Sequence, residues 1–137
     1  KNTRHIGIGY LKGYGLKSGA VATSVAHDSH NIICVGTSDE DMAFAVNRIA
    51  QNRGGIVVVK NGQVLAELPL EIAGIISGKP LREVNTLLED AKKAAHALGV
   101  GTDIDPFMTL SFMSLPVIPT LRLTTRGVVD VNTQQYV

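Results

Sequence analysis

The fold is decided by the stretch Ile56-Val57-Val58-Val59-Lys60-Asn61-Gly62-Gln63-Val64-Leu65-Ala66-Glu67-Leu68. Two largely apolar runs, 56–60 and 63–68, flank an Asn-Gly pair. Asn-Gly tolerates the positive φ angles of a type I′ turn, so this pattern is the strongest short-range signal for a β-hairpin. Pro69 comes next and has no backbone N–H group to continue a strand ladder. The stretch therefore predicts an antiparallel hairpin that ends at Pro69.

Two further strands are predicted upstream of the hairpin, at 18–25 and 32–36. Both runs are short, bounded by glycine and rich in small and β-branched residues, which is typical of buried strands. The second run contains Cys34, the only cysteine, so the chain has no internal disulfide. Within an apolar strand this thiol is expected to be a small buried side chain rather than a reactive group. A free thiol also agrees with a reducing compartment, and we expect a cytoplasmic protein.

Two amphipathic helices are predicted, one before and one after the hairpin. The first begins after Thr37, with Glu40 completing a capping box, and ends at Gly54-Gly55. The second begins near Pro80, which suits a first helical turn, and ends at Gly99. The apolar stripes are Met42, Ala45, Val46 and Ile49 in the first helix, and Leu81, Val84, Leu87, Leu88, Ala91, Ala95 and Leu98 in the second.

The remaining segments complete the predicted architecture. Residues 4–15 contain four glycines and predict a Gly-rich strand and turn with close backbone packing, because the helix that a phosphate-binding loop requires does not follow. Residues 107–119 are uncharged and contain two Met and two Phe. Residues 120–125 and 127–131 alternate apolar and polar side chains and predict two closing strands. We therefore expect an α/β or α+β fold with a mixed β-sheet packed against two main helices, as a single domain over residues 1–137.

The composition argues against two classes of partner. The 13 basic and 12 acidic residues give a net charge of +1, and aromatic residues are 4% with no Trp, so neither the charge nor the stacking surface for a nucleic acid is present. No apolar run reaches the roughly 18 residues that span a bilayer. The start, Lys1–His5, has neither an initiator Met nor the apolar region of a signal peptide. We expect the chain to be a piece of a longer polypeptide.

Side chains that can take part in catalysis or ligand binding are concentrated in the turn His27-Asp28-Ser29-His30-Asn31, between the two upstream strands. Polar groups that leave a buried strand need water, a partner or a ligand. His27, Asp28 and His30 could supply three metal ligands, although their spacing differs from the i,i+4 histidine pair of zinc proteases. Ser29, Asp28 and an imidazole could form a triad, although neighbours on an extended chain point apart. A plain turn, in which polar side chains bond their own backbone, is the third alternative.

Glu71 is a secondary candidate, because it is the single carboxylate within the apolar segment 70–78. A buried carboxylate needs a partner, so its presence here favours either a functional acid or a structural cap. The structural alternative is a solvated or capping side chain at a junction between a strand and a helix.

Several blocks of this chain resemble the C-terminal domain of bacterial adenine deaminase. The likeness covers nearly the whole chain, and it includes the polar turn described above. The blocks are 13–20 (GYGLKSGA), 24–32 (SVAHDSHNI), 35–42 (VGTSDEDM), 54–58 (GGIVV), 68–74 (LPLEIAG), 105–110 (DPFMTL) and 114–119 (SLPVIP).

The resemblance implies a metal-dependent amidohydrolase that converts adenine and water to hypoxanthine and ammonia, in purine salvage or catabolism. In that family a hydroxide activated by a binuclear iron or manganese site attacks the ring carbon that bears the amino group. The metals are held in a barrel domain by a His-x-His pair, further histidines and an acidic residue. This chain has no His-x-His pair, so we expect it to hold no catalytic residue and no metal ligand, and to be inactive alone.

The resemblance also implies the partners of the domain: its own barrel domain, adenine as substrate and further copies of the enzyme in a homo-oligomer. One hypothesis is that the 27–31 turn reaches the mouth of the barrel, where Asp28, Ser29 or His30 hydrogen-bonds the purine or orders the catalytic water. The rival hypothesis is that the turn only fixes the domain interface. We also expect residues 107–119 to pack on the barrel or on a neighbouring subunit. A hypothesis from another class is a stand-alone small-ligand or protein-interaction domain.

Overall fold

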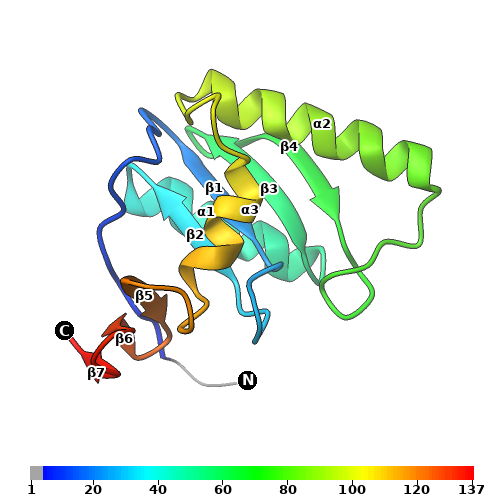
Figure 1. Ribbon diagram of the computed structural model, residues 1–137. Coiled ribbons are helices and arrows are strands. Elements are labelled where there is room, and N and C mark those ends of the chain that lie inside the picture. The colour runs from blue at the N-terminus through cyan, green and yellow to red at the C-terminus, as the bar shows by residue number, and fades with distance from the viewer. Residues whose placement is uncertain (1–4) are drawn as a thin grey trace.

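The computed structural model describes residues 5–137. The expectation about the start of the chain rests partly on residues 1–4, which lie outside the described residues. No helix within residues 5–137 combines the length and the apolar character needed to cross a membrane. The elements follow the order β1 (Ala20–Thr23), β2 (Ile33–Gly36), α1 (Asp39–Gln51), β3 (Gly55–Lys60), β4 (Gln63–Pro69), α2 (Leu81–Ala97), α3 (Pro106–Met113), β5 (Leu121–Thr124), β6 (Gly127–Asp130) and β7 (Gln135–Tyr136) (Figure 1).

The predicted hairpin is confirmed, because β3 and β4 pair antiparallel on either side of Asn61 and Gly62. The φ angles of these two residues are 52° and 69°, which are the positive values that a type I′ turn requires. The buried carboxylate of Asp41 in α1 accepts hydrogen bonds from the Asn61 N–H at 3.1 Å and from the Gly62 N–H at 2.8 Å. The hairpin turn is thereby fastened to the helix that precedes it.

The hairpin forms half of a four-stranded sheet with the order β2-β1-β3-β4. The two predicted upstream strands are confirmed as β1 and β2, and each pair of neighbours in this sheet is antiparallel. The α+β class is therefore confirmed, whereas the sheet is antiparallel where a mixed sheet was expected. The reason is that α1 connects β2 to β3, which flank β1 on opposite sides, so the crossover joins strands that are not neighbours.

Helices cover both faces of this sheet. α1 lies on one face, while α2 and α3 lie on the other (Figure 1). Side chains of β1 and β3 alternate between the two cores, as the period of two along a strand requires. Burial on both faces explains why these strands are continuous apolar runs. The α1 side buries Ala20, Ala22, Ala45, Ile49, Val57 and Val59, and the opposite side includes Val21, Ile56, Val58, Leu68, Ala91 and Ala95.

Cys34 in β2 packs partly buried against the core on the α1 side. Burial raises the pKa of the Cys34 thiol to about 12, so the group stays protonated at neutral pH. The expected packing of Cys34 against the core is confirmed, with the side chain partly rather than fully buried.

The starts of the two predicted helices differ in detail from the expectation. Ser38 is the N-cap of α1, and its hydroxyl accepts from the Asp41 N–H at 3.3 Å. The predicted cap at Thr37 was wrong, because the Thr37 hydroxyl donates to the Gly19 carbonyl at 3.4 Å instead. The apolar face of α2 is confirmed except at its first residue, Leu81, which is 85% exposed.

The third helix, α3, was not predicted from the sequence. Its N-cap is Asp105, whose carboxylate accepts from the backbone N–H groups of Phe107 and Met108, and Pro106 occupies the first helical position. An Asp-Pro pair followed by apolar residues was the available signal. The segment 107–119 is thus partly a helix that packs on α2 and on the sheet.

The two ends of the described chain meet at a second, smaller sheet, with the order β5-β6-β7. The two predicted closing strands are confirmed, and β7 adds a short third one. The predicted strand within 4–15 was wrong, since no strand is formed in residues 5–19, but the expected close backbone packing is present. A Cβ atom at Gly7 would lie 1.8 Å from the Thr124 carbonyl oxygen, so the segment rests directly on the β5–β6 hairpin.

A bidentate ion pair joins α1 to β4. Arg48 donates to both carboxylate oxygens of Glu67, at 2.8 and 2.7 Å, and Asn52 donates to the same group at 2.9 Å. The hydrogen bond from Arg48 lowers the pKa of Glu67 below its ordinary value. Because the folded-state pKa is depressed, this contribution to stability is present above about pH 4.5 and is lost as the pH falls through the folded-state pKa.

Glu67→Gln is expected to lower the free energy of unfolding by about 1 kcal/mol at neutral pH, because it removes a charged acceptor from a partly exposed pair. The loss should shrink at about pH 3, where Glu67 itself is increasingly protonated. Urea unfolding of both proteins at the two pH values measures this difference. An equal loss at both pH values would contradict a role for the carboxylate charge.

Candidate functional site

The 27–31 turn connects β1 to β2, and its backbone closes on itself. The His30 N–H donates to the Ala26 carbonyl at 2.7 Å, with a φ of 49° at His30. The Asn31 side-chain amide donates to the Ser29 hydroxyl at 3.1 Å. The side chain of Asp28 is 88% exposed. The turn therefore combines a hydrogen-bonded backbone with polar side chains that project from it.

α3 holds the first residue of this turn by three contacts. The His27 N–H donates to the Ser111 carbonyl at 3.2 Å, and the Ser114 hydroxyl donates to the His27 carbonyl at 3.0 Å. The rings of His27 and Phe112 stack with their centroids 5.4 Å apart and an angle of 29° between the planes. Backbone and side chain of His27 are thus both positioned by α3.

α3 is itself tied to the rest of the molecule at its N-terminus. The Asp105 carboxylate accepts from the Met108 N–H at 2.9 Å and pairs with the Lys92 ammonium of α2 at 3.0 Å. Although burial opposes the shift, these groups lower the pKa of Asp105. The buried Tyr14 hydroxyl donates to the Pro106 carbonyl at 3.0 Å, and burial raises the pKa of Tyr14. The N-terminus of α3, the helix that holds His27, is therefore fixed by Lys92 of α2 and by Tyr14.

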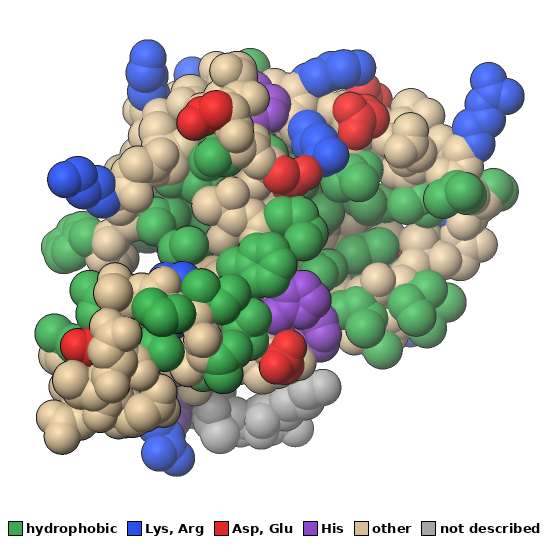
Figure 2. Space-filling view, viewed as in Figure 1, with side chains coloured by type: hydrophobic (Ala, Val, Ile, Leu, Met, Phe, Trp, Pro, Cys, Tyr) green, Lys and Arg blue, Asp and Glu red, His purple; other side chains and the backbone are tan. Residues whose placement is uncertain are grey.

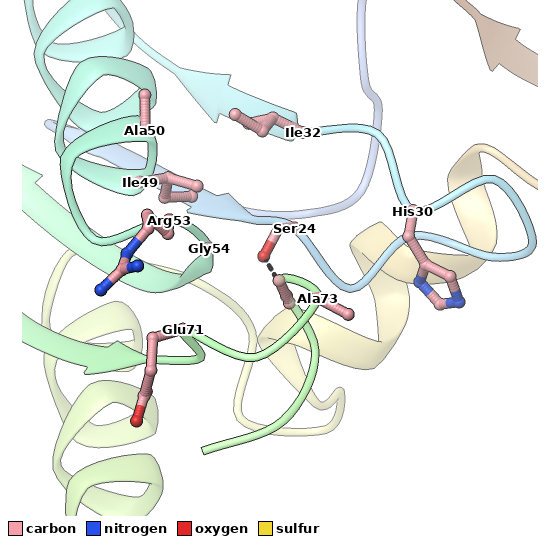
Figure 3. Close-up of a pocket in the computed structure, with 10 residues that line it drawn as sticks. Ser24, His30, Ile32, Ile49, Ala50, Arg53, Gly54, Glu71 and Ala73 are labelled. Atoms are coloured by element: carbon pink, nitrogen blue, oxygen red, sulfur yellow. Dashed lines mark hydrogen bonds between the residues drawn. The ribbon is translucent and has the colours of Figure 1, made fainter. Parts of the chain in front are cut away.

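His30 and Glu71 line one pocket of about 350 Å³, although they are far apart in the sequence. In Figure 3 they lie on opposite sides of Ser24 and Ala73, and their side chains do not point toward one another. Nδ1 of His30 is buried and has no hydrogen-bond partner among the described residues. Glu71 accepts from the Gly78 N–H at 3.0 Å, and hydrogen bonds from its own backbone and from this N–H lower the pKa of Glu71. This contact is the kind of local partner that the structural alternative for Glu71 expects.

Ser24 was not predicted as a site residue from the sequence. Its buried hydroxyl accepts from the Gly55 N–H at 2.7 Å. It also donates to the Gly74 carbonyl at 2.5 Å (Figure 3). It thereby joins the end of β1 to the start of β3 and to the segment that carries Glu71. The available signal was a serine that directly follows a buried apolar strand.

The side chains of the turn do not converge as a metal site or as a triad. Within residues 5–137, no three His, Cys, Asp or Glu side chains come together in a way that could hold a metal ion. Nδ1 of His27 lies 3.9 Å from the Asp28 carboxylate, and the His27 and His30 ring centroids are 5.6 Å apart. The Ser29 hydroxyl is bonded to Asn31, so the triad alternative gains no support from the geometry. This bond joins two side chains, whereas the plain turn expects side chains bonded to their own backbone, so only the backbone bond from His30 to Ala26 agrees with that alternative.

An apolar surface borders the turn. Figure 2 shows hydrophobic side chains gathered over α3, with histidine side chains at their edge. On this helix Met108 and Phe112 are 45% and 37% exposed, whereas Phe107 and Leu110 are buried. One face of α3 therefore completes the core of this chain, and another face stays open beside the candidate turn.

The sequence is similar to adenine deaminases over nearly its whole length. Residues 1–135 match the sequence model of a family described as the adenine deaminase C-terminal domain. The adenine deaminase of Nitratidesulfovibrio vulgaris is 51% identical over 137 residues, covering 99% of this chain and 24% of that protein. The adenine deaminase of Geobacillus kaustophilus is 48% identical over 132 residues, covering 96% of this chain and 23% of that protein. The adenine deaminase of Bacillus subtilis is 45% identical over 137 residues, covering 100% of this chain and 24% of that protein.

The chain thus spans about a quarter of the length of these curated relatives. A family match over residues 1–135 includes every strand and helix named above except the last residue of β7. The chain belongs to the adenine deaminase C-terminal domain family.

Proposed function

We propose that residues 1–137 form the C-terminal domain of an enzyme that hydrolyses adenine to hypoxanthine and ammonia, and that the 27–31 turn faces the substrate site. The relatives are adenine deaminases about four times as long as this chain, which supports this arrangement. One observation carries the role of the turn. His27 at its base is held by a hydrogen bond from Ser114 and by stacking on Phe112, while the Asp28 side chain is 88% exposed. Side chains that recognise a ligand need this kind of rigid support.

We assign to the residues of this chain the binding and orientation of adenine and of the attacking water. The described residues offer no donor set that fits the iron or manganese pair implied by the resemblance. Adenine presents an amino group as donor and ring nitrogens as acceptors. A carboxylate such as Asp28 accepts from the amino group, and the imidazole of His30 bonds a ring nitrogen or the attacking water. The buried Nδ1 of His30, which has no hydrogen-bond partner within residues 5–137, supports this assignment.

We also propose the setting of the complete enzyme: a cytoplasmic homo-oligomer in purine metabolism that uses manganese or iron in its barrel domain. The free thiol of Cys34 supports a reducing compartment. The open apolar face of α3, with Met108 and Phe112, supports a contact of segment 107–119 with the barrel or with a neighbouring subunit.

Asp28→Ala and His30→Ala in the full-length enzyme test the role of the turn. Each is expected to lower kcat/KM for adenine at least tenfold, which corresponds to about 1.4 kcal/mol of transition-state stabilisation. Asp103→Ala is a matched control, because Asp103 is an exposed carboxylate in another loop. Ammonia release and thermal unfolding are measured for all three proteins. Unchanged turnover with intact folding in both turn variants would contradict the role of the turn and favour a purely interfacial one.

A second candidate function is a stand-alone small-ligand domain. The pocket between His30 and Glu71 favours it, since about 350 Å³ suits a small molecule and Ser24 and Arg53 add polar groups to its lining. The intact mass of the native gene product separates the two candidates, because only the first requires a chain about four times as long.

A further inference from the structure

The first described segment carries an apolar stripe that its own fold leaves uncovered. Ile6, Ile8 and Tyr10 are 83%, 79% and 107% exposed. The residues between them face the opposite way: a Cβ atom at Gly7 would lie 1.8 Å from the Thr124 carbonyl oxygen, and one at Gly9 would lie 3.1 Å from Val128. Glycine thus faces the β5–β6 hairpin while large apolar side chains face outward.

This alternation is what a strand buried on both faces requires. The inner side packs by its backbone on the small sheet, and Figure 1 shows the segment as an extended trace beside β5 and β6. Within residues 5–137, no hydrogen bond joins the backbone of residues 6–11 to another residue. An extended segment with free N–H and C=O groups and an uncovered apolar face is a template for pairing with another strand.

The observations also indicate which surface covers the stripe. Residues 6–11 carry no charge, so the complementary surface is apolar rather than ionic. About three quarters of the length of the relatives lies outside this chain, which provides a large surface in the same polypeptide. Three large, uncovered apolar side chains on one short segment are unusual for a protein surface exposed to water.

We propose that the stripe Ile6, Ile8 and Tyr10 docks on an apolar, strand-bearing face of the larger part of the full-length polypeptide. This second contact lies apart from the 27–31 turn and rests on the full-length arrangement proposed above, but not on a role of the turn in catalysis. Strand pairing through the free backbone groups of residues 6–11 sets the register, and the three side chains exclude water from the seam.

Cysteine labelling in the full-length enzyme tests this contact. Ile8→Cys and Leu81→Cys place a thiol at two sites with nearly equal exposure in this chain, 79% and 85%. Labelling by a maleimide, followed site by site with mass spectrometry, is expected to be at least about tenfold slower at position 8, because the reaction needs access to the thiol. Equal rates at both positions would overturn the proposal.

Two further measurements keep the result unambiguous. The double variant Ile6→Asp/Ile8→Asp should lower the Tm of the full-length enzyme by several degrees, whereas Leu81→Asp should not, since only the stripe is covered.

Hydrogen exchange of the unmodified enzyme should show protected amides in residues 6–10. Protection that disappears on dilution to the monomer would assign the stripe to a second copy of the chain and overturn the proposal. Because none of these readouts is turnover, a failure here is distinct from a failure of the turn variants.

Discussion

Gly54→Ala is expected to destabilise the chain by more than about 3 kcal/mol. Gly54 has a φ of 129°, a conformation that residues with a Cβ atom rarely adopt. An added Cβ atom would lie 2.2 Å from Cα of Gly74 and 2.8 Å from the Leu70 carbonyl oxygen. Both neighbours are backbone atoms, so no side chain can move aside to relieve the clash. Urea unfolding of the two proteins gives the difference in free energy.

Gly62→Ala is the matched control for this prediction. Gly62 also has a positive φ, 69°, but nothing lies within 4 Å of a Cβ atom placed there. Its substitution adds backbone strain without a clash and is expected to cost about 1 kcal/mol. If Gly54→Ala cost no more than Gly62→Ala, the close approach of Gly54 to Gly74 would be contradicted. That approach forms one wall of the pocket lined by Ser24, His30 and Glu71.

Local sequence patterns predicted the elements whose turn residues or apolar stripes lie within the element itself. The hairpin followed from Asn61-Gly62, and the two long helices followed from apolar stripes between capping residues and glycines. α3 lacked such a signal, because six of the eight residues in Pro106–Met113 are apolar and only Thr109 and Ser111 are polar. An almost wholly apolar segment shows no helical period. The antiparallel order of the main sheet also depends on which strands become neighbours, which periodicity does not determine.

The candidate turn was predicted from its residues, but its support was not. The hydrogen bond from Ser114 to His27 joins residues 87 positions apart. The shared pocket of His30 and Glu71 depends equally on the folded sheet and on the bonds made by Ser24. Contacts between residues so far apart in the sequence arise from packing. A single sequence therefore shows which polar groups are available but not which of them lie together in the fold.

Leu110→Ala is expected to lower the free energy of unfolding by about 3 kcal/mol, because it removes a buried side chain and leaves a cavity under α3. Leu110 is 1% exposed and lies in the core on the α2 and α3 side of the sheet. It is the residue before Ser111, whose carbonyl accepts from the His27 N–H, so looser packing of Leu110 also weakens the support of the candidate turn. Urea unfolding measures the first effect, and the chemical shifts of His27 report the second.

Met108→Ala on the same helix is the control, since Met108 is 45% exposed and its loss should cost about 1 kcal/mol or less. The comparison separates the two faces of α3. A large loss for Leu110→Ala with a small one for Met108→Ala means that the inner face belongs to the core of this chain while the outer face is available to a partner. Equal losses would mean that both faces are buried here, which would remove the open apolar surface beside the turn and with it the support for docking through residues 107–119.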